Sequence, residues 1–367
     1  MVNRPLAQLR ERRPELAGGV ESTLPRLVEP LIWGALSAGL ILLVLANLGL
    51  GAFDVEVGRI IAIILGKIGI NVGIDYTARE EAVVWVIRVP RMLMAAAVGA
   101  GLGVSGAALQ GLFRNPLADP GLIGVSSGAA FAVAVAVVLG TVSWGLFVQP
   151  VAAFLGGLVL TFLIYGFARR SGRAQMATML LVGIAVNALL GAGISLILSF
   201  SDDEQLRDIV FWMLGSLAGS LWEFAYSAGP LILFAIVVLV RQSGALNLLT
   251  LGDAEARHLG VPVQRTQLTI VSAAALATGA GVAVAGVVGF IGLIAPHMVR
   301  LAVGPDHRRL MPASALAGAI LVLGADLGAR TIVAPAEMPL GVLTAVIGTP
   351  VFLFLIDRAR RSLASGF

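Results

Sequence analysis

Apolar residues follow one another in long runs that short polar connections separate, from residue 30 almost to the C-terminus. We count about ten runs, several of them shorter than the roughly 20 residues that a straight helical crossing of a bilayer needs. The runs cover residues 30–51, 89–112, 121–141, 147–168, 176–200, 227–241, 266–285, 287–303, 311–328 and 339–357. The pattern predicts an all-α integral membrane protein with about ten transmembrane helices, built as one domain over residues 30–367.

The most polar interruption inside this apolar body is residues 246–265, which read LNLLTLGDAEARHLGVPVQR. We predict a helix of about six residues there, with Asp253 as its N-cap and Glu255 in its first turn. Gly260 is expected to end the helix in a left-handed conformation, and Pro262 forbids its continuation. Because so short a helix is not stable alone, its flanks or another protein must hold it. The segment is therefore predicted to be a docking element.

Two longer polar connections carry helix signals of their own. Residues 52–87 include a central apolar patch that predicts a surface helix. Residues 201–226 begin SDDEQ, where Ser201 or Asp202 is a suitable N-cap for an amphipathic helix. A very tight turn at Gly286 is expected to join the two apolar runs on either side of it.

Positive charge orients the chain in the membrane. With the N-terminus placed inside, most of the 25 Lys and Arg residues fall in the tail and in the inner connections. Because cytoplasmic loops of membrane proteins are enriched in Lys and Arg, both termini are predicted to be cytoplasmic. Residues 1–29 then form a cytoplasmic N-terminal tail, and residues 246–265 face the cytoplasm.

The chain holds no recognisable source of energy or catalytic motif. Lys67 is its only lysine and is followed by Ile68, so the Gly-Lys-Ser/Thr of a phosphate-binding loop is absent. If ATP powers the protein, the nucleotide therefore binds a separate chain. Protease and hydrolase motifs are missing, and with no Cys and only three His the composition predicts no metal site.

The apolar runs hold almost no ionisable side chains. Arg88, Arg91 and Asp326 lie at the outer ends of predicted spans and Asp357 at the inner end of the last one, where we expect all four to reach water. A transporter coupled to protons or sodium is expected to keep an acid in the membrane interior. The pattern favours a conduit powered by another protein, with an ion-coupled secondary transporter as a less favoured alternative.

The connection at residues 110–128 is rich in helix breakers. Pro116 and Pro120 interrupt helices, and Asn115 and Asp119 are placed to bond the freed backbone groups. These residues leave two interpretations open, a sharp cytoplasmic hairpin or a gate at the inner mouth of a pore.

Three segments resemble the signatures of one family. They are residues 88–129 (RVPRMLMAAAVGAGLGVSGAALQGLFRNPLADPGLIGVSSGA), 251–262 (LGDAEARHLGVP) and 289–312 (GFIGLIAPHMVRLAVGPDHRRLMP). The family is that of the FecCD-type permeases, the transmembrane subunits of type II ABC importers for iron–siderophores, haem and cobalamin. The similarity runs in order from about residue 30 to residue 357.

The resemblance implies a homodimer around a central translocation path in the bacterial cytoplasmic (inner) membrane, surrounded by lipid. Two cytoplasmic ATPase subunits would bind ATP and Mg²⁺ beneath it, and a periplasmic binding protein would deliver the substrate from outside. The chain itself is expected to bind no cofactor and no nucleic acid.

The resemblance also implies roles for particular residues. Those expected to couple to the ATPase are Leu251, Gly252, Asp253, Glu255, Arg257, His258 and Gly260. Those expected at the cytoplasmic gate are Asn115, Pro116 and Leu117, with a second gate loop near residues 172–178. Those expected to dock the binding protein are Arg330 and, by position only, Arg59, Lys67 and Arg79.

Haem is the expected transported substrate. Residues 201–217 and 331–341 look most like the haem-importing branch of the family, and an apolar interior suits a large, mostly hydrophobic ligand. An iron–siderophore or cobalamin, carried by the same architecture, is the alternative.

Overall fold

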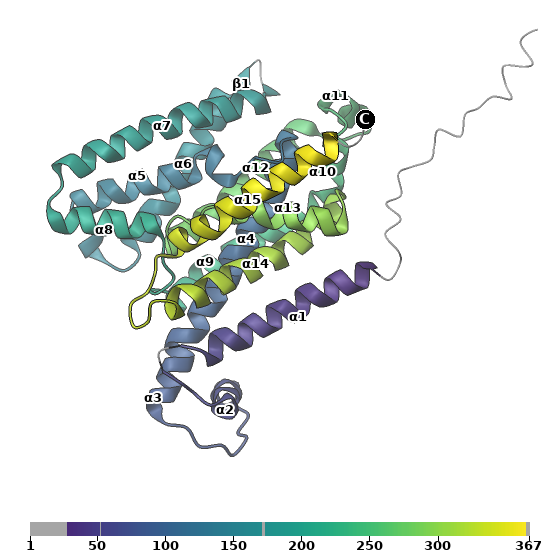
Figure 1. The fold of residues 1–367 in the computed structure, drawn as a ribbon. Helices are drawn as coiled ribbons and strands as arrows, with labels where there is room; N and C mark the ends of the chain where they lie inside the picture. Colours follow the sequence, from purple (N-terminus) through teal and green to yellow (C-terminus); the bar gives the residue numbers. More distant parts are fainter. Residues whose placement is uncertain (1–27, 52, 171–172, 365–367) are drawn as a thin grey trace, which may run out of the picture.

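The computed structural model describes residues 28–51, 53–170 and 173–364. The predicted tail, residues 1–29, lies almost wholly outside the described residues, as does Gly172 of the predicted second gate loop. Within the described ranges the regular secondary structure is helical apart from one short β-hairpin (Figure 1). Seven of the described helices are long and apolar enough to cross a membrane, and three shorter apolar helices occupy other predicted spans. The structure confirms an all-α membrane fold, whereas the count of ten crossings stays a prediction.

The α-helices in chain order are α1 (Val28–Gly49), α2 (Val57–Lys67), α3 (Ala78–Glu81), α4 (Val89–Phe113), α5 (Val125–Val138), α6 (Val148–Phe167), α7 (Met176–Phe200), α8 (Asp203–Leu214), α9 (Trp222–Arg241), α10 (Ser243–Leu249), α11 (Asp253–His258), α12 (Val263–Ala285), α13 (Ile291–Val303), α14 (His307–Thr331) and α15 (Leu340–Ala364). The other elements are the π-helix η1 (Ala82–Arg88), the 3-10 helices η2 (Pro120–Ile123) and η3 (Thr141–Trp144), and the strands β1 (Arg169–Arg170) and β2 (Arg173–Ala174).

The centre of the bundle is one continuous helix made of α3, η1 and α4. It runs over 36 residues, Ala78–Phe113, and packs against α9, α12, α13 and α14. The apolar pattern predicts a start near residue 89, so the first turns were missed. They form because Thr77 and Glu80 make a capping box, in which each side chain bonds the other residue's backbone N–H.

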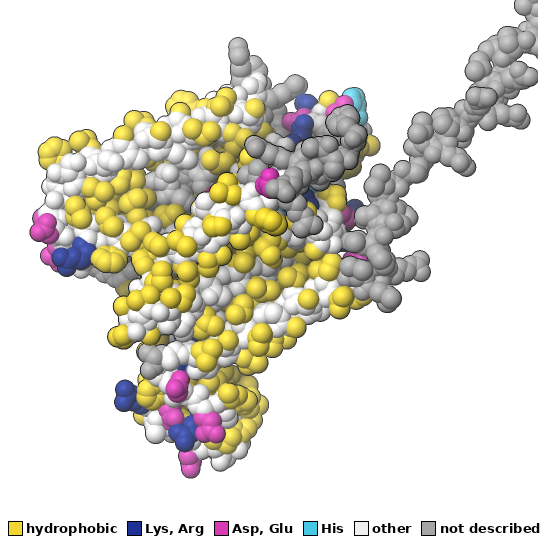
Figure 2. Space-filling model, viewed as in Figure 1, with side chains coloured by type: hydrophobic (Ala, Val, Ile, Leu, Met, Phe, Trp, Pro, Cys, Tyr) yellow, Lys and Arg dark blue, Asp and Glu magenta, His cyan; other side chains and the backbone are white. Residues whose placement is uncertain are grey.

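The two ends of the bundle differ in what they carry. Figure 1 shows β1, α10, α11 and the C-terminal mark at one end and α2, α3 and α8 at the other. We call these the α11 end and the α2 end. Charged side chains gather at the ends, while hydrophobic side chains cover the face between them (Figure 2). The arginine distribution predicts that the α11 end is cytoplasmic.

Three local predictions are confirmed. Helix α2 forms in the predicted surface-helix region, and α8 starts after Asp202, whose carboxylate accepts bonds from the N–H groups of Glu204 and Gln205. Gly286 adopts a φ of +66°, and a Cβ there would overlap the carbonyl oxygen of Trp212. Only glycine suits such a turn, which separates α12 from α13.

The predicted span at residues 121–141 is shorter in the structure. Its first residues form η2 instead, and Gly124 then turns the chain with a φ of +90°. Asp119 caps η2 by accepting a hydrogen bond from the N–H of Gly121 at 2.8 Å. Helix α5 therefore has only 14 residues.

Candidate coupling and gate site

The predicted docking segment contains two short helices, α10 and α11, where the sequence predicted one. Leu246, Leu249 and Ala256 are buried and anchor the pair to the bundle. Leu251 and Leu259 point outward instead, with 61% and 58% of their surface exposed. The pair is thus an anchored knob with an apolar tip at the α11 end.

The prediction that Asp253 caps α11 is wrong. Gly252 occupies the N-cap with a φ of +125°, and Asp253 is the first helical residue. Its side chain makes no cap bond because its carboxylate is engaged elsewhere. The other predictions hold: Glu255 lies in the first turn, and Gly260 follows the helix with a φ of +88°.

Asp253 joins three separate parts of the chain. One carboxylate oxygen, Oδ1, accepts a hydrogen bond from Nη2 of Arg114, and the two side chains form an ion pair. The other, Oδ2, accepts from Nε2 of Gln267 on α12 at 3.1 Å. Within α11, Nε of Arg257 donates to the Asp253 carbonyl at 2.9 Å. Asp253 therefore ties α11 to α12 and to the end of α4.

The predicted gate residues Asn115, Pro116 and Leu117, which we call the gate turn, directly follow Arg114. Arg114 ends α4 in the left-handed conformation, with φ +50° and ψ +37°. Oδ1 of Asn115 accepts the N–H of Leu117 at 2.9 Å, and the N–H of Asn115 donates to the carbonyl of Gln110 at 3.1 Å. These bonds give the gate turn a defined shape beside the knob.

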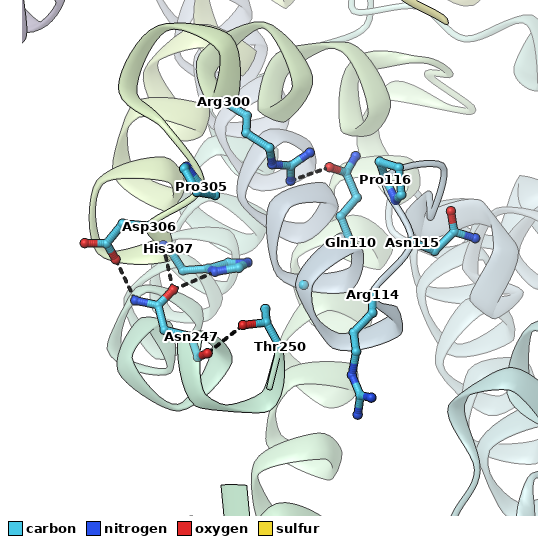
Figure 3. A pocket seen from close by; sticks show the side chains of 11 residues that line it. Gln110, Arg114, Asn115, Pro116, Asn247, Thr250, Arg300, Pro305, Asp306 and His307 are labelled. Atoms are coloured by element: carbon cyan, nitrogen blue, oxygen red, sulfur yellow. Dashed lines mark hydrogen bonds between the residues drawn. The ribbon is translucent and has the colours of Figure 1, made fainter. Parts of the chain in front are cut away.

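A cavity of about 550 Å³ lies between the gate turn and α10 (Figure 3). Nη2 of Arg300, on α13, donates to Oε1 of Gln110 at 2.8 Å on one side. On the other side Asn247 of α10 donates to Asp306 at 2.6 Å and accepts the backbone N–H of His307 at 2.9 Å. Two separate groups of hydrogen-bonded side chains thus line opposite sides of the cavity.

At the α2 end the predicted docking cations differ in their surroundings. Arg59 pairs with Glu80 at 2.6 Å, and Lys67 pairs with Glu81 at 2.5 Å. The guanidinium of Arg79 lies over the ring of Phe53, 4.8 Å from its centroid. Arg79 is exposed, and no carboxylate of the described residues lies within ion-pair distance of it.

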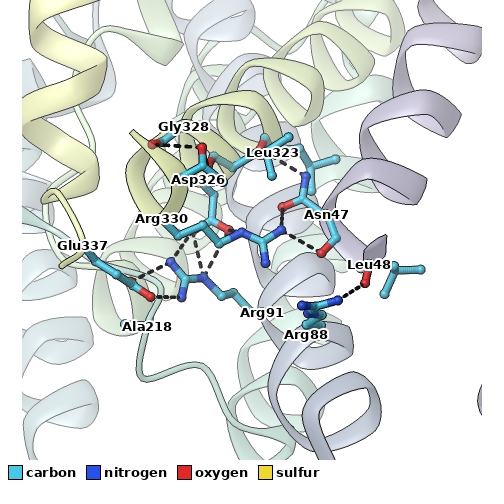
Figure 4. A network of polar contacts seen from close by, with 12 residues as sticks. Asn47, Leu48, Arg88, Arg91, Ala218, Leu323, Asp326, Gly328, Arg330 and Glu337 are labelled. Atoms are coloured by element: carbon cyan, nitrogen blue, oxygen red, sulfur yellow. Dashed lines mark hydrogen bonds and ion pairs between the residues drawn. The ribbon is translucent and has the colours of Figure 1, made fainter. Parts of the chain in front are cut away.

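Figure 4 shows Arg330 pointing toward Asn47 at the end of α1. Nη2 of Arg330 donates to the carbonyl of Asn47 at 2.6 Å and to its side-chain oxygen at 3.0 Å. Only 9% of the Arg330 side chain is exposed. To meet a partner's acid, the guanidinium would have to leave these acceptors, so its docking role stays a prediction.

The expectation that Arg88, Arg91 and Asp326 reach water is wrong. Arg91 and Asp326 are 6% and 1% exposed, and Arg88 is buried as it donates to the carbonyl of Leu48. Arg91 contacts Asp326 at 2.9 Å and also makes two parallel 2.9 Å bonds to Glu337 (Figure 4). A buried acid does exist, but an arginine neutralises it.

Sequence reasoning missed Glu337, Asn47 and Gln267. Glu337 and Asn47 are single polar residues in a loop or apolar context, and their partners lie far away in the chain, whereas Gln267 bonds Asp253 across the turn between α11 and α12. Glu337 and Arg91, for example, are 246 positions apart. The hydrogen bond from Arg91 holds the pKa of the Glu337 carboxyl below its ordinary value, although partial burial acts the other way.

The fold and the α11 end together define a class, the permease subunit of an ABC importer, a transport subunit and not an enzyme. A solved ABC transporter assigned to the metal-chelate type, in an inward-facing conformation, matches with a TM-score of 0.79 and 33% identity. The match covers 90% of this chain and 99% of that one. The chain belongs to the FecCD transport family, whose model matches residues 39–358.

Several curated relatives are similar over most of their length. A hemin transport system permease protein, HmuU of Yersinia pestis, is 48% identical over 281 residues, covering 76% of this chain and 84% of the relative. A cobalamin import system permease protein, BtuC of Halobacterium salinarum, is 44% identical, covering 79% and 77%. A vitamin B12 import system permease protein, BtuC of Vibrio cholerae, is 39% identical, covering 82% and 90%.

Proposed function

We propose that this chain is the permease of an ATP-driven haem importer in a bacterial inner membrane. The observation that carries the choice of haem is the 48% identity to a hemin permease, against 44% and 39% to two cobalamin permeases. The chain would act as a homodimer, with both termini cytoplasmic. ATP and Mg²⁺ would bind partner ATPase subunits, and a periplasmic binding protein would deliver haem to the α2 end.

The shape of the α10–α11 knob supports the proposal that the ATPase docks on it. Its exposed Leu251 and Leu259 offer an apolar tip, and its buried residues fix it to the bundle. Movement of the ATPase subunits would shift α11, and the Asp253 contacts would carry the shift to α12 and α4. ATP and the loaded binding protein must each prefer one conformation, since a ligand shifts an equilibrium only through differential affinity.

Cobalamin is the second candidate substrate, because two of the similar relatives are cobalamin permeases. An iron–siderophore is a third, within the same family. The cargo is tested with the transporter in nanodiscs, using ATPase and binding protein from the same operon. Haem-loaded binding protein is expected to stimulate ATP hydrolysis. Stimulation by cobalamin or a ferric siderophore, but not by haem, would contradict the proposed substrate and leave the importer class intact.

A further inference from the structure

The ion pair between Arg114 and Asp253 connects α11, the predicted ATPase-docking helix, with the start of the gate turn. Asp253 is the first residue of α11, and Arg114 is the last residue before the gate turn. The two residues are 139 positions apart, and their side chains meet at the α11 end. Their ion pair directly joins α11 to the end of α4.

Backbone geometry makes Arg114 suited to such a role. With a φ of +50° it is one of two non-glycine residues in the described ranges that have positive φ, a conformation rare for a long side chain. The left-handed turn ends α4 and aims the chain into the gate turn. The residue that pairs with Asp253 is therefore also the residue at which the gate turn begins.

Asp253 is held from the opposite side. The 3.1 Å bond from Gln267 ties its second oxygen to α12, so the carboxylate moves with α11 and α12 together. The pair itself is partly exposed, at 45% for the Arg114 side chain and 35% for that of Asp253. Exposed pairs are weak, which makes this contact reversible on the scale of a transport cycle.

We propose that the Arg114–Asp253 pair positions the gate turn against the ATPase-docking helix, so that displacement of α11 moves the gate. This inference rests on the proposed function, because it takes α11 as the element that the ATPase moves. Neither residue touches the substrate in this account. Both act by coupling ATP hydrolysis to opening of the gate turn.

The test uses single and double substitutions in the complete complex. Arg114→Asn removes the charge, and Asn tolerates the left-handed backbone. Asp253→Asn removes the other charge. The double variant R114D/D253R restores a pair with reversed polarity, and the Gln267 amide can turn its oxygen toward the new guanidinium. Each single variant is expected to lower the amount of haem transported per ATP hydrolysed about two- to fivefold, the range for losing an exposed pair.

The chain offers a matched control pair at the same end. Arg309 and Glu29 form an ion pair at 3.0 Å with 42% and 36% exposure, joining α14 to α1 and not to the gate turn. Arg309→Asn is expected to leave the transport-to-hydrolysis ratio unchanged. Recovery of that ratio in R114D/D253R, to at least half of wild type, is the expected result. Single variants with wild-type coupling, or a double variant no better than they are, would overturn the proposal.

A second measurement needs no knowledge of the cargo. Because the chain has no Cys, Leu117→Cys gives a single thiol on the gate turn, at a side chain that is 48% exposed. With a cysteine-free ATPase, ATP is expected to change the maleimide-labelling rate, and Arg114→Asn to reduce that change. If wild type does not transport haem, the proposed function fails on its own. If labelling responds to ATP equally with and without the pair, the coupling inference fails on its own.

Discussion

At the scale of single residues, the α2 end depends on one arginine. Arg91 bridges Asp326 on α14 and Glu337 in the following connection, and Asp326 is almost fully buried. The sequence analysis placed Arg91 and Asp326 at the outer ends of spans and expected both side chains to reach water. Glu337 in the 332–339 connection bonds Arg91 over a separation of 246 positions, and no local pattern shows such a contact.

Removing Arg91 is expected to be strongly destabilising. Arg91→Met removes the hydrogen bonds that the buried Asp326 carboxylate accepts and leaves it only the more distant Arg330, at 3.9 Å, at a cost of about 3–5 kcal/mol. Thermal unfolding of the purified protein in detergent measures the effect. Arg309→Met, which breaks the partly exposed pair with Glu29, is the control and is expected to cost about 1 kcal/mol or less. Equal effects of the two substitutions would contradict the buried network.

Glu337 is expected to make stability sensitive to acid. Because its pKa is lowered in the folded state, its contribution is fully present above the ordinary carboxyl value of 4.5. The contribution is lost as pH falls through the lower, folded-state pKa. The melting temperature of Glu337→Gln should therefore fall less than that of wild type between about pH 6 and pH 3. An identical acid dependence in both proteins would argue against the ion pair.

At the scale of elements, apolar runs predict where helices exist but not how closely they pack. The runs located the long helices, Gly286 located the turn before α13, and the Ser201–Asp202 N-cap signal located the start of α8. The start of the central helix and the contacts of Asp253 were missed, because a polar first turn and a distant partner leave no periodic signal. Packing of α4 on α13 depends on Gly106, where a Cβ would overlap the carbonyl oxygen of Gly292.

Gly106→Ala is expected to disrupt this packing. The added methyl group meets backbone, which cannot rotate away, so we expect destabilisation of about 1–3 kcal/mol or more. Gly191 on α7 is the matched control, because nothing lies within 4 Å of a Cβ there. Gly191→Ala should be neutral or slightly stabilising, since Ala favours helices more than Gly does. Chemical unfolding in mixed micelles distinguishes the two substitutions.

At the scale of the whole molecule, the two ends carry different sets of polar residues. The α11 end holds the knob, the gate turn and the cavity between them, whereas the α2 end holds the cations expected to face the binding protein. Of these cations, Arg79 is exposed and lies over the ring of Phe53, while Arg330 is bonded to Asn47. Arg79 is therefore the more accessible docking candidate of the two, whereas the sequence analysis favoured Arg330.

Arg79→Glu is expected to slow association of the loaded binding protein about two- to tenfold at low salt, because it reverses a steering charge. The effect should shrink at high salt, where screening shortens the reach of the charge. Surface plasmon resonance on nanodisc-held transporter at two salt concentrations measures both. Arg79→Gln is expected to fall between wild type and Arg79→Glu. If the association rate changes neither with the charge at position 79 nor with the salt concentration, Arg79 is not part of the docking surface.

We propose that this permease imports haem with energy from ATP hydrolysed by a partner. The most direct measurement is uptake of iron-labelled haem into proteoliposomes that contain the permease, its ATPase and external binding protein. We expect uptake only with ATP on the ATPase side, and unchanged uptake when proton and sodium gradients are collapsed. Uptake driven by an ion gradient without ATP, or no haem uptake while another iron complex or cobalamin is carried, would contradict the account.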